Sequence, residues 1–225
     1  MTSAIDICNL SLSLLGDTAN ITSIDPPEGS AQAEYCARFY PLARKTVLSM
    51  HPWSFATKRA VLSSITTAHP PPETWEYTYA VPSALIKILG VYSAEAVLDE
   101  NKTQVAYEVS GDFNTRVLYS NIDNAVIRYV ANVDDTTRFS PLLVNAIAYV
   151  LASHLAGPII KGVESIKISE AMLNRGLAYG EKAMAEDANQ TNSSATQLDT
   201  RHPAPWIEER GSLWPHQDTK IIRNV

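Results

Sequence analysis

One stretch of the chain constrains the fold more than any other, and it reads His51-Pro52-Trp53-Ser54-Phe55-Ala56-Thr57-Lys58-Arg59. A helical pattern leads into it, and Pro52 disfavours helical geometry at His51, so the helix should end there. Trp53 and Phe55 are two positions apart and therefore point to the same side of an extended chain. Because two aromatic side chains bury a large apolar area, we predict that they fill the core where a helical layer meets a sheet.

The composition excludes some classes of protein. The chain has 225 residues, of which 45% are apolar and 19% charged, enough to bury a sizeable core. Its net charge of −6 and its pI near 5.4 argue against a protein that grips DNA phosphates with clustered Lys and Arg. An acidic balance instead suits a surface that DNA slides past.

No targeting or membrane segment is expected. The N-terminus lacks the basic, apolar and small-residue pattern of a signal peptide. The longest apolar run, residues 142–160, is interrupted by Asn145, Ser153, His154 and Gly157-Pro158, so it does not predict a membrane span.

Apolar residues at helical spacing predict four helices. Their ranges are 3–15, 30–51, 140–156 and 165–185. Ser3 is a candidate N-cap, and Ser140-Pro141 is a strong helix start. Pro41 predicts a kink or break in the second helix, and Gly157-Pro158 predicts the end of the third. The third helix is apolar nearly all round, which places it at the centre of the core or between subunits.

Short β-rich runs separated by turn signals occupy residues of about 59–133. Trp75, Tyr77 and Tyr79 alternate with small or polar residues, which is the period of a strand, and they join the predicted core. The short spacing of the runs predicts an antiparallel meander. The predicted fold class is therefore α+β, with N- and C-terminal helices forming a helical bundle, an inserted antiparallel β-meander and an extended C-terminal arm.

The composition changes near residue 187, which divides the chain into a body, 1–186, and a linker with a docking arm, 187–225. Residues 189–197 are polar and small, as in a linker. Large apolar residues then recur among charges and prolines. They include Trp206, Ile207, Trp214, Ile221 and Ile222. Aromatic anchors on a flexible segment are typical of docking to a partner, although packing of the arm on its own domain stays open.

No pattern of catalytic, cofactor-binding or metal-binding residues stands out, and we expect none of these sites. The five histidines lie in five different contexts without a ligand at metal spacing. Cys8 and Cys36 each lie among apolar residues of a predicted helix and are expected to be small buried hydrophobes. Catalytic residues need not be close in sequence, so a hydrolase of unrecognised type stays open as an alternative.

Several motifs, in this order along the chain, resemble one family. Leu14-Leu15-Gly16 ends the first helix, Ile21-Thr22-Ser23-Ile24-Asp25 follows, and Arg38-Phe39-Tyr40-Pro41-Leu42-Ala43-Arg44 runs into the stretch that begins at His51. With the run Trp75-Glu76-Tyr77-Thr78-Tyr79-Ala80-Val81-Pro82 and the apolar helix after Ser140, the chain is similar to the tail tubular protein A family. These proteins are head-to-tail adaptors, or connectors, of short-tailed bacteriophages.

The resemblance covers roughly residues 3–186 and implies a structural virion protein without enzyme activity or cofactor. It implies a homo-oligomeric ring, commonly of twelve copies, between the portal protein and the tail nozzle protein in the neck of the virion. Such a subunit is made in the host cytoplasm. Double-stranded DNA would pass through the lumen during ejection without specific binding, and no membrane partner is implied. We expect acidic residues to line the lumen. The competing hypothesis is a phage or bacterial assembly protein that binds one partner without forming a ring.

Overall fold

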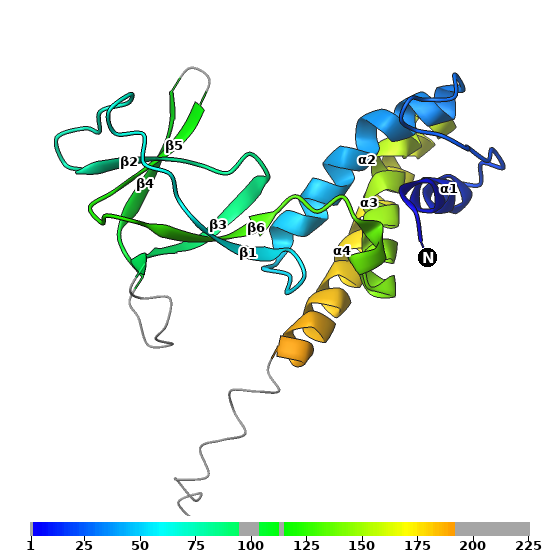
Figure 1. The fold of residues 1–225 in the computed structure, drawn as a ribbon. Helices are drawn as coiled ribbons and strands as arrows, with labels where there is room; N and C mark the ends of the chain where they lie inside the picture. Colours follow the sequence, from blue (N-terminus) through cyan, green and yellow to red (C-terminus); the bar gives the residue numbers. More distant parts are fainter. Residues whose placement is uncertain (1, 95–103, 113–114, 192–225) are drawn as a thin grey trace, which may run out of the picture. The chain divides into compact units, whose positions relative to one another are not determined.

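A computed structural model of the chain describes residues 2–94, 104–112 and 115–191 (Figure 1). Within them, two α-helices are followed by six β-strands and then by two further α-helices, and every paired strand is antiparallel. The fold class is therefore α+β. Residues 1–187 form one compact unit, and residues 188–225 form a second unit.

Helices α1, Ala4–Leu14, and α2, Ala31–Met50, begin at serine caps. Ser3 Oγ accepts from the Asp6 backbone N–H at 3.1 Å, and Asp6 Oδ2 accepts from the Ser3 N–H at 2.8 Å, so both orphan donors are satisfied. A kink or a break was predicted at Pro41. The break is wrong, because α2 continues through this residue to Met50. His51 then adopts extended geometry, as the following proline requires.

Helix α3, Pro141–Ile160, begins where it was predicted, with Ser140 as its cap and Pro141 in its first turn. The stop predicted at Gly157-Pro158 is wrong. Pro158 removes one hydrogen bond near the end of the helix, but the helix continues until Lys161 and Gly162, which have φ of 58° and 76°. Helix α4, Glu164–Thr191, follows directly and extends past the predicted end at residue 185.

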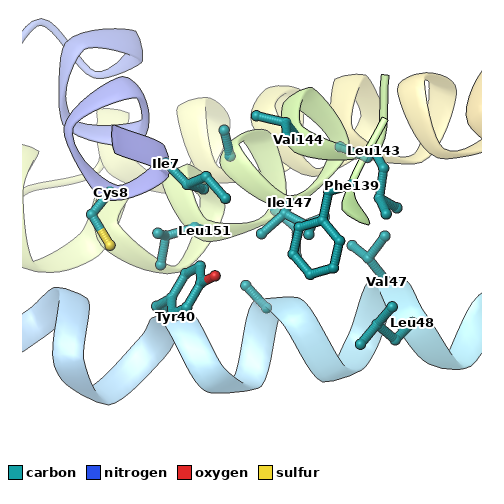
Figure 2. Packing of buried hydrophobic residues seen from close by; sticks show 14 of the residues in the cluster. Ile7, Cys8, Tyr40, Val47, Leu48, Phe139, Leu143, Val144, Ile147 and Leu151 are labelled. Atoms are coloured by element: carbon teal, nitrogen blue, oxygen red, sulfur yellow. The ribbon is translucent and has the colours of Figure 1, made fainter. Parts of the chain in front are cut away.

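The helices share one hydrophobic cluster with the predicted aromatic stretch. Figure 2 shows Ile7 and Cys8 from α1 meeting Tyr40 from α2 and Leu151 from α3. The apolar composition of α3 explains this arrangement, since eleven of its residues are buried. Helix α3 is therefore the centre against which α1 and α2 pack.

The strands form two small sheets. Strands β1, Thr57–Val61, and β3, Leu85–Tyr92, both pair with β6, Val126–Ala131, so the order is β1-β6-β3. Strands β2, Tyr77–Ala80, and β4, Tyr107–Asp112, both pair with β5, Thr115–Ser120. The single meander predicted for this region is corrected to two three-stranded sheets, because β6 pairs with strands far from it in sequence.

Strand β6 connects the two hydrophobic clusters. Val130 belongs to the helical cluster, whereas Ile127 and Tyr129 belong to a second cluster with Tyr79 and Leu118. Because successive side chains of a strand point to opposite faces, one strand serves both cores. The first sheet is thus buried on both faces along β6.

Candidate interaction site

Trp53 and Phe55, the predicted core pair, lie at the end of α2. Trp53 is 1% exposed and its Nε1–H donates to the Val47 carbonyl oxygen at 3.2 Å. Phe55 is partly buried, with its ring centroid 5.7 Å from that of Phe139. The indole satisfies its polar atom and also packs on apolar side chains, as buried tryptophan requires.

The aromatic residues of the second run lie apart from this pair. Tyr79 is 1% exposed in the second cluster, and Tyr77 is partly buried beside it, with ring centroids 6.2 Å apart. Trp75 precedes β2, is partly exposed, and donates from Nε1 to Glu108 Oε2 at 2.9 Å. The sequence grouped Trp75, Tyr77 and Tyr79 as one strand in the core, but β2 begins only at Tyr77. Trp75 instead makes a hydrogen bond at the surface.

Asp187, near the end of α4, joins this helix to the turn after α2. Its Oδ1 accepts from Ser54 Oγ at 2.6 Å, its Oδ2 from the Ser54 backbone N–H at 3.0 Å, and His51 Nε2 lies 3.3 Å from Oδ2. A nucleophilic serine needs its hydroxyl beside a histidine base. Here both side chains converge on the carboxylate instead, so the grouping acts as a clasp between two elements and does not have the order of a catalytic triad.

Helices α3 and α4 approach each other closely along a line of small residues. A Cβ atom at Gly176 would lie 2.8 Å from Val150 Cγ2 and 3.1 Å from the Val150 backbone nitrogen. Ser169 Oγ donates to the Ser153 carbonyl oxygen at 2.8 Å farther along the same line. Because only glycine permits this approach, the two backbones are held at a fixed separation.

This close approach creates an open pocket. The rings of Tyr149 and Tyr179 stack with centroids 5.2 Å apart and an angle of 11° between their planes. Arg175, Ala178 and Lys182, all exposed residues of α4, complete the lining of a pocket of about 350 Å³. Lys182 Nζ lies 5.5 Å from the centre of the Tyr179 ring. The pocket therefore combines a rigid aromatic surface with two positive charges.

The charges of this pocket have no carboxylate partner among the described residues. The ion pairs of that part of the chain involve Arg44, His51, Arg138 and Lys167, and neither Arg175 nor Lys182 takes part in one. Two unpaired cations beside tyrosine rings suit a ligand that brings a carboxylate and an apolar or aromatic group.

Helix α4 also carries exposed apolar residues. Ile166 is 69% exposed, and Leu173 and Leu177 are also exposed on the same helix. Their spacing of seven and four positions places the three residues on one face. Val163 is exposed just before the helix begins. The exposed Glu170 lies between Ile166 and Leu173 on this face. Exposed apolar residues grouped on one helix face are typical of an interaction surface.

The two cysteines of the helical cluster, Cys8 and Cys36, are fully buried. The hydrogen bond of Cys8 to Cys36, followed by burial, raises the pKa of the Cys8 thiol, and both cysteines are free. A thiol that stays protonated is a poor nucleophile and metal ligand. Burial lowers the pKa of His154, whose ring stacks on that of Phe39 at 5.9 Å. Among residues 2–94, 104–112 and 115–191, no three His, Cys, Asp or Glu residues are grouped as metal ligands.

One helix within the described part of the chain, α3, is long and apolar enough to cross a membrane by length and composition, with a mean hydropathy of 1.6. In this structure 61% of that apolar window is buried inside the fold, as in the core helix of a folded domain.

The site residues predicted for the arm, Trp206, Ile207, Trp214, Ile221 and Ile222, lie outside the described residues. Conversely, the pocket between α3 and α4 was not predicted from the sequence. Its one local signal is the pair Gly176 and Gly180, four positions apart, which is typical of closely packed helices.

A scan against protein-family models finds no model that matches this chain, and a search of curated proteins finds no match. The likeness to tail adaptors therefore depends on the sequence motifs described above.

Proposed function

We propose that this chain is a structural subunit of a phage neck, a head-to-tail adaptor that forms a ring between portal and tail nozzle. In this proposal the helices form a bundle that makes the contacts between about twelve copies, and the C-terminal arm docks on a neighbouring copy or on the portal. The lumen passes double-stranded DNA during ejection. The sequence resemblance supports the family, and the structure supplies a surface suited to assembly.

The exposed apolar stripe of α4 is the observation that carries the proposal. Ile166, Leu173 and Leu177 share one face of a long helix, and α4 packs on α3 through Gly176, about a quarter turn away around the helix. Leaving such a stripe in water costs about 25 cal/mol for each Å² that a partner could cover. Repetition of one such contact around an axis closes a ring of identical subunits.

The charge of the chain suits a conduit for DNA. With 24 acidic and 18 basic residues, the assembled ring carries net negative charge and does not retain phosphates. Ser54 and His51 both contact the Asp187 carboxylate, so this grouping joins α4 to the turn after α2. Tight binding of duplex DNA at moderate salt would contradict the conduit.

A pair of matched substitutions tests the role of the stripe. Ile166→Asp places a charge on the proposed contact, whereas Val61→Asp places one at a residue of β1 that is equally exposed, 67% against 69%. We expect Ile166→Asp to prevent ring formation in the presence of purified portals and Val61→Asp to leave it unchanged. Negative-stain images and light scattering measure the outcome. Equal assembly of both variants would remove the stripe from the interface.

Deletion of residues 201–225 tests the arm separately. We expect the truncated chain to keep the thermal unfolding transition of the full chain but to lose ring assembly or portal docking. Normal assembly would show that the arm is dispensable. A discrete dimer, or a complex with one copy per partner, would instead support an assembly protein that forms no ring.

A further inference from the structure

The pocket between α3 and α4 has a chemistry that the ring proposal does not use. Tyr149 and Tyr179 provide a flat, fixed aromatic wall, and Arg175 and Lys182 provide two positive charges without carboxylate partners in the described residues. A pocket of about 350 Å³ is near the lower end of the range of about 300–1,000 Å³ for ligand sites. It therefore suits one large side chain together with an acidic neighbour.

One segment of the chain outside the described residues has this chemistry, and it reads Pro205-Trp206-Ile207-Glu208-Glu209. In an extended chain, residues two apart share one side and lie about 7 Å apart. If the segment binds in this extended form, Glu208 is on the same side as Trp206 and Glu209 is on the opposite side. An indole on the tyrosine wall thus brings one carboxylate, that of Glu208, towards the cations.

The spacing of the pocket residues fits this pattern. Arg175 and Lys182 are seven positions apart on α4, which separates their backbones by about 10.5 Å along the helix. Tyr179 lies between them in sequence. An indole that covers Tyr179 is therefore about 5 Å, measured along the helix, from the position of either cation. The carboxylate of Glu208 follows about 7 Å from Trp206 in an extended chain, and the long side chains of Arg and Lys can reach it.

The second tryptophan of the arm fits less well. Trp214 is followed by Pro215, His216 and Gln217, and its next carboxylate is Asp218. In an extended chain, four positions correspond to about 13 Å, too far for both groups to contact one pocket. Charge complementarity therefore selects the segment around Trp206.

We infer that, in the assembled protein, the segment Pro205–Glu209 of one copy occupies the pocket of a second copy that is lined by Tyr149, Arg175, Tyr179 and Lys182. This inference rests on the proposed ring, in which a second copy contacts α4 through the stripe. Arg175 and Lys182 lie on the opposite side of this helix, so the length of the arm has to carry the segment to the pocket. The 14 residues from 192 to 205 span up to about 50 Å, enough to reach a neighbouring subunit. Trp206 covers the aromatic wall and Glu208 pairs with Arg175 or Lys182.

Photo-cross-linking of the full chain tests this contact. The substitution Trp206→benzoylphenylalanine is made in chains labelled with light or heavy nitrogen, which are mixed before irradiation with portals present. Mass spectrometry then identifies the peptides that are joined. We expect cross-links between light and heavy chains, from position 206 to the peptides that contain Tyr149 or Tyr179.

Charge changes give the test its specificity. We expect Arg175→Glu with Lys182→Glu to lower the yield of these cross-links about tenfold, since charge-assisted contacts are lost, and Glu208→Lys to restore it in the same chain. Glu208→Gln should lower the yield, whereas its neighbour Glu209→Gln should not. Both cations are exposed, so the thermal unfolding of the variants should match that of the parent.

Each contrary result overturns the inference. These results are cross-links within one chain only, cross-links to other elements, or a yield that the charge reversal does not change. Rings that form normally without the cross-link overturn the inference and leave the proposed function standing. Light–heavy cross-links in a protein that forms no ring support the contact between segment and pocket and overturn the proposed ring.

Discussion

Gly176 of α4 lies so close to Val150 of α3 that a Cβ at position 176 would be 2.8 Å from Val150 Cγ2. The same Cβ would be 3.1 Å from the Val150 backbone nitrogen, which cannot rotate away. The neighbouring residues Tyr149 and Tyr179 stack across the same two helices. The separation of the helices therefore determines the shape of the pocket.

Gly176→Ala should destabilise the fold although alanine favours helix. Overpacking costs about 1–3 kcal/mol, whereas the gain in helix propensity is about 1 kcal/mol, so we expect a net loss of about 1 kcal/mol in urea unfolding. Gly157→Ala is the control, because its Cβ would meet nothing within 4 Å. A Gly176→Ala variant as stable as the Gly157→Ala variant would mean that α3 and α4 separate at little cost.

Trp53→Ala should unfold the subunit. Its effect should not be limited to the loss of one contact with a partner. The side chain is 1% exposed among helices and strands, and truncation of a buried tryptophan costs about 3–5 kcal/mol. The matched change Trp75→Ala should cost less, because Trp75 is partly exposed. A stable Trp53→Ala protein that failed only in docking would move this residue from core to interface.

Local sequence signals predicted the starts of the helices and the end of α2, because these depend on neighbouring residues. The serine caps at Ser3 and Ser140 and the extended geometry at His51 are of this kind. The end of α3 was missed, since Pro158 near its C-terminus removes only one hydrogen bond and tertiary packing offsets the loss. The end of α4 was also missed, because this helix continues into the polar residues up to Thr191.

Long-range pairing was not predictable from the same signals. Strand β1 pairs with β6, with Arg59 opposite Arg128, and no local pattern selects a partner so distant in sequence. The pocket was missed for a similar reason. Tyr149 looks like an ordinary residue of an apolar helix and Tyr179 like one of an amphipathic helix until the turn at Lys161 and Gly162 brings the two helices together.

Arg44 and Asp134 should respond unequally to neutralisation. The Arg44 side chain is 10% exposed and pairs with Asp134, whose side chain is 73% exposed. Arg44 Nη2 also donates a hydrogen bond to Asn132 Oδ1 at 3.2 Å. Asp134→Asn leaves a buried guanidinium charge and should cost about 1–3 kcal/mol. Arg44→Met leaves the Asp134 carboxylate, which water can solvate, so we expect this variant to lose less free energy of unfolding than Asp134→Asn. Equal losses in urea unfolding would contradict this assignment.

His154 should make the fold less stable in mild acid. Burial lowers its pKa below the ordinary value of 6.5, so near and below pH 6.5 the unfolded chain binds a proton that the folded chain does not. The contribution of the neutral imidazole to stability is complete above pH 6.5 and is lost as the pH falls towards the folded pKa. His154→Gln should therefore reduce the dependence of the unfolding midpoint on pH in this range, relative to the parent. An unchanged pH dependence would contradict the expected desolvation of this ring.

Images of the purified chain mixed with purified portals test the central claim most directly. A free monomer in solution does not decide the matter, because an adaptor can wait for the portal as a template. We expect a ring of about twelve copies, the number implied by the family resemblance, seated on the portal with an open central channel. Portals that stay bare, or that bind isolated copies without rotational symmetry, would contradict it.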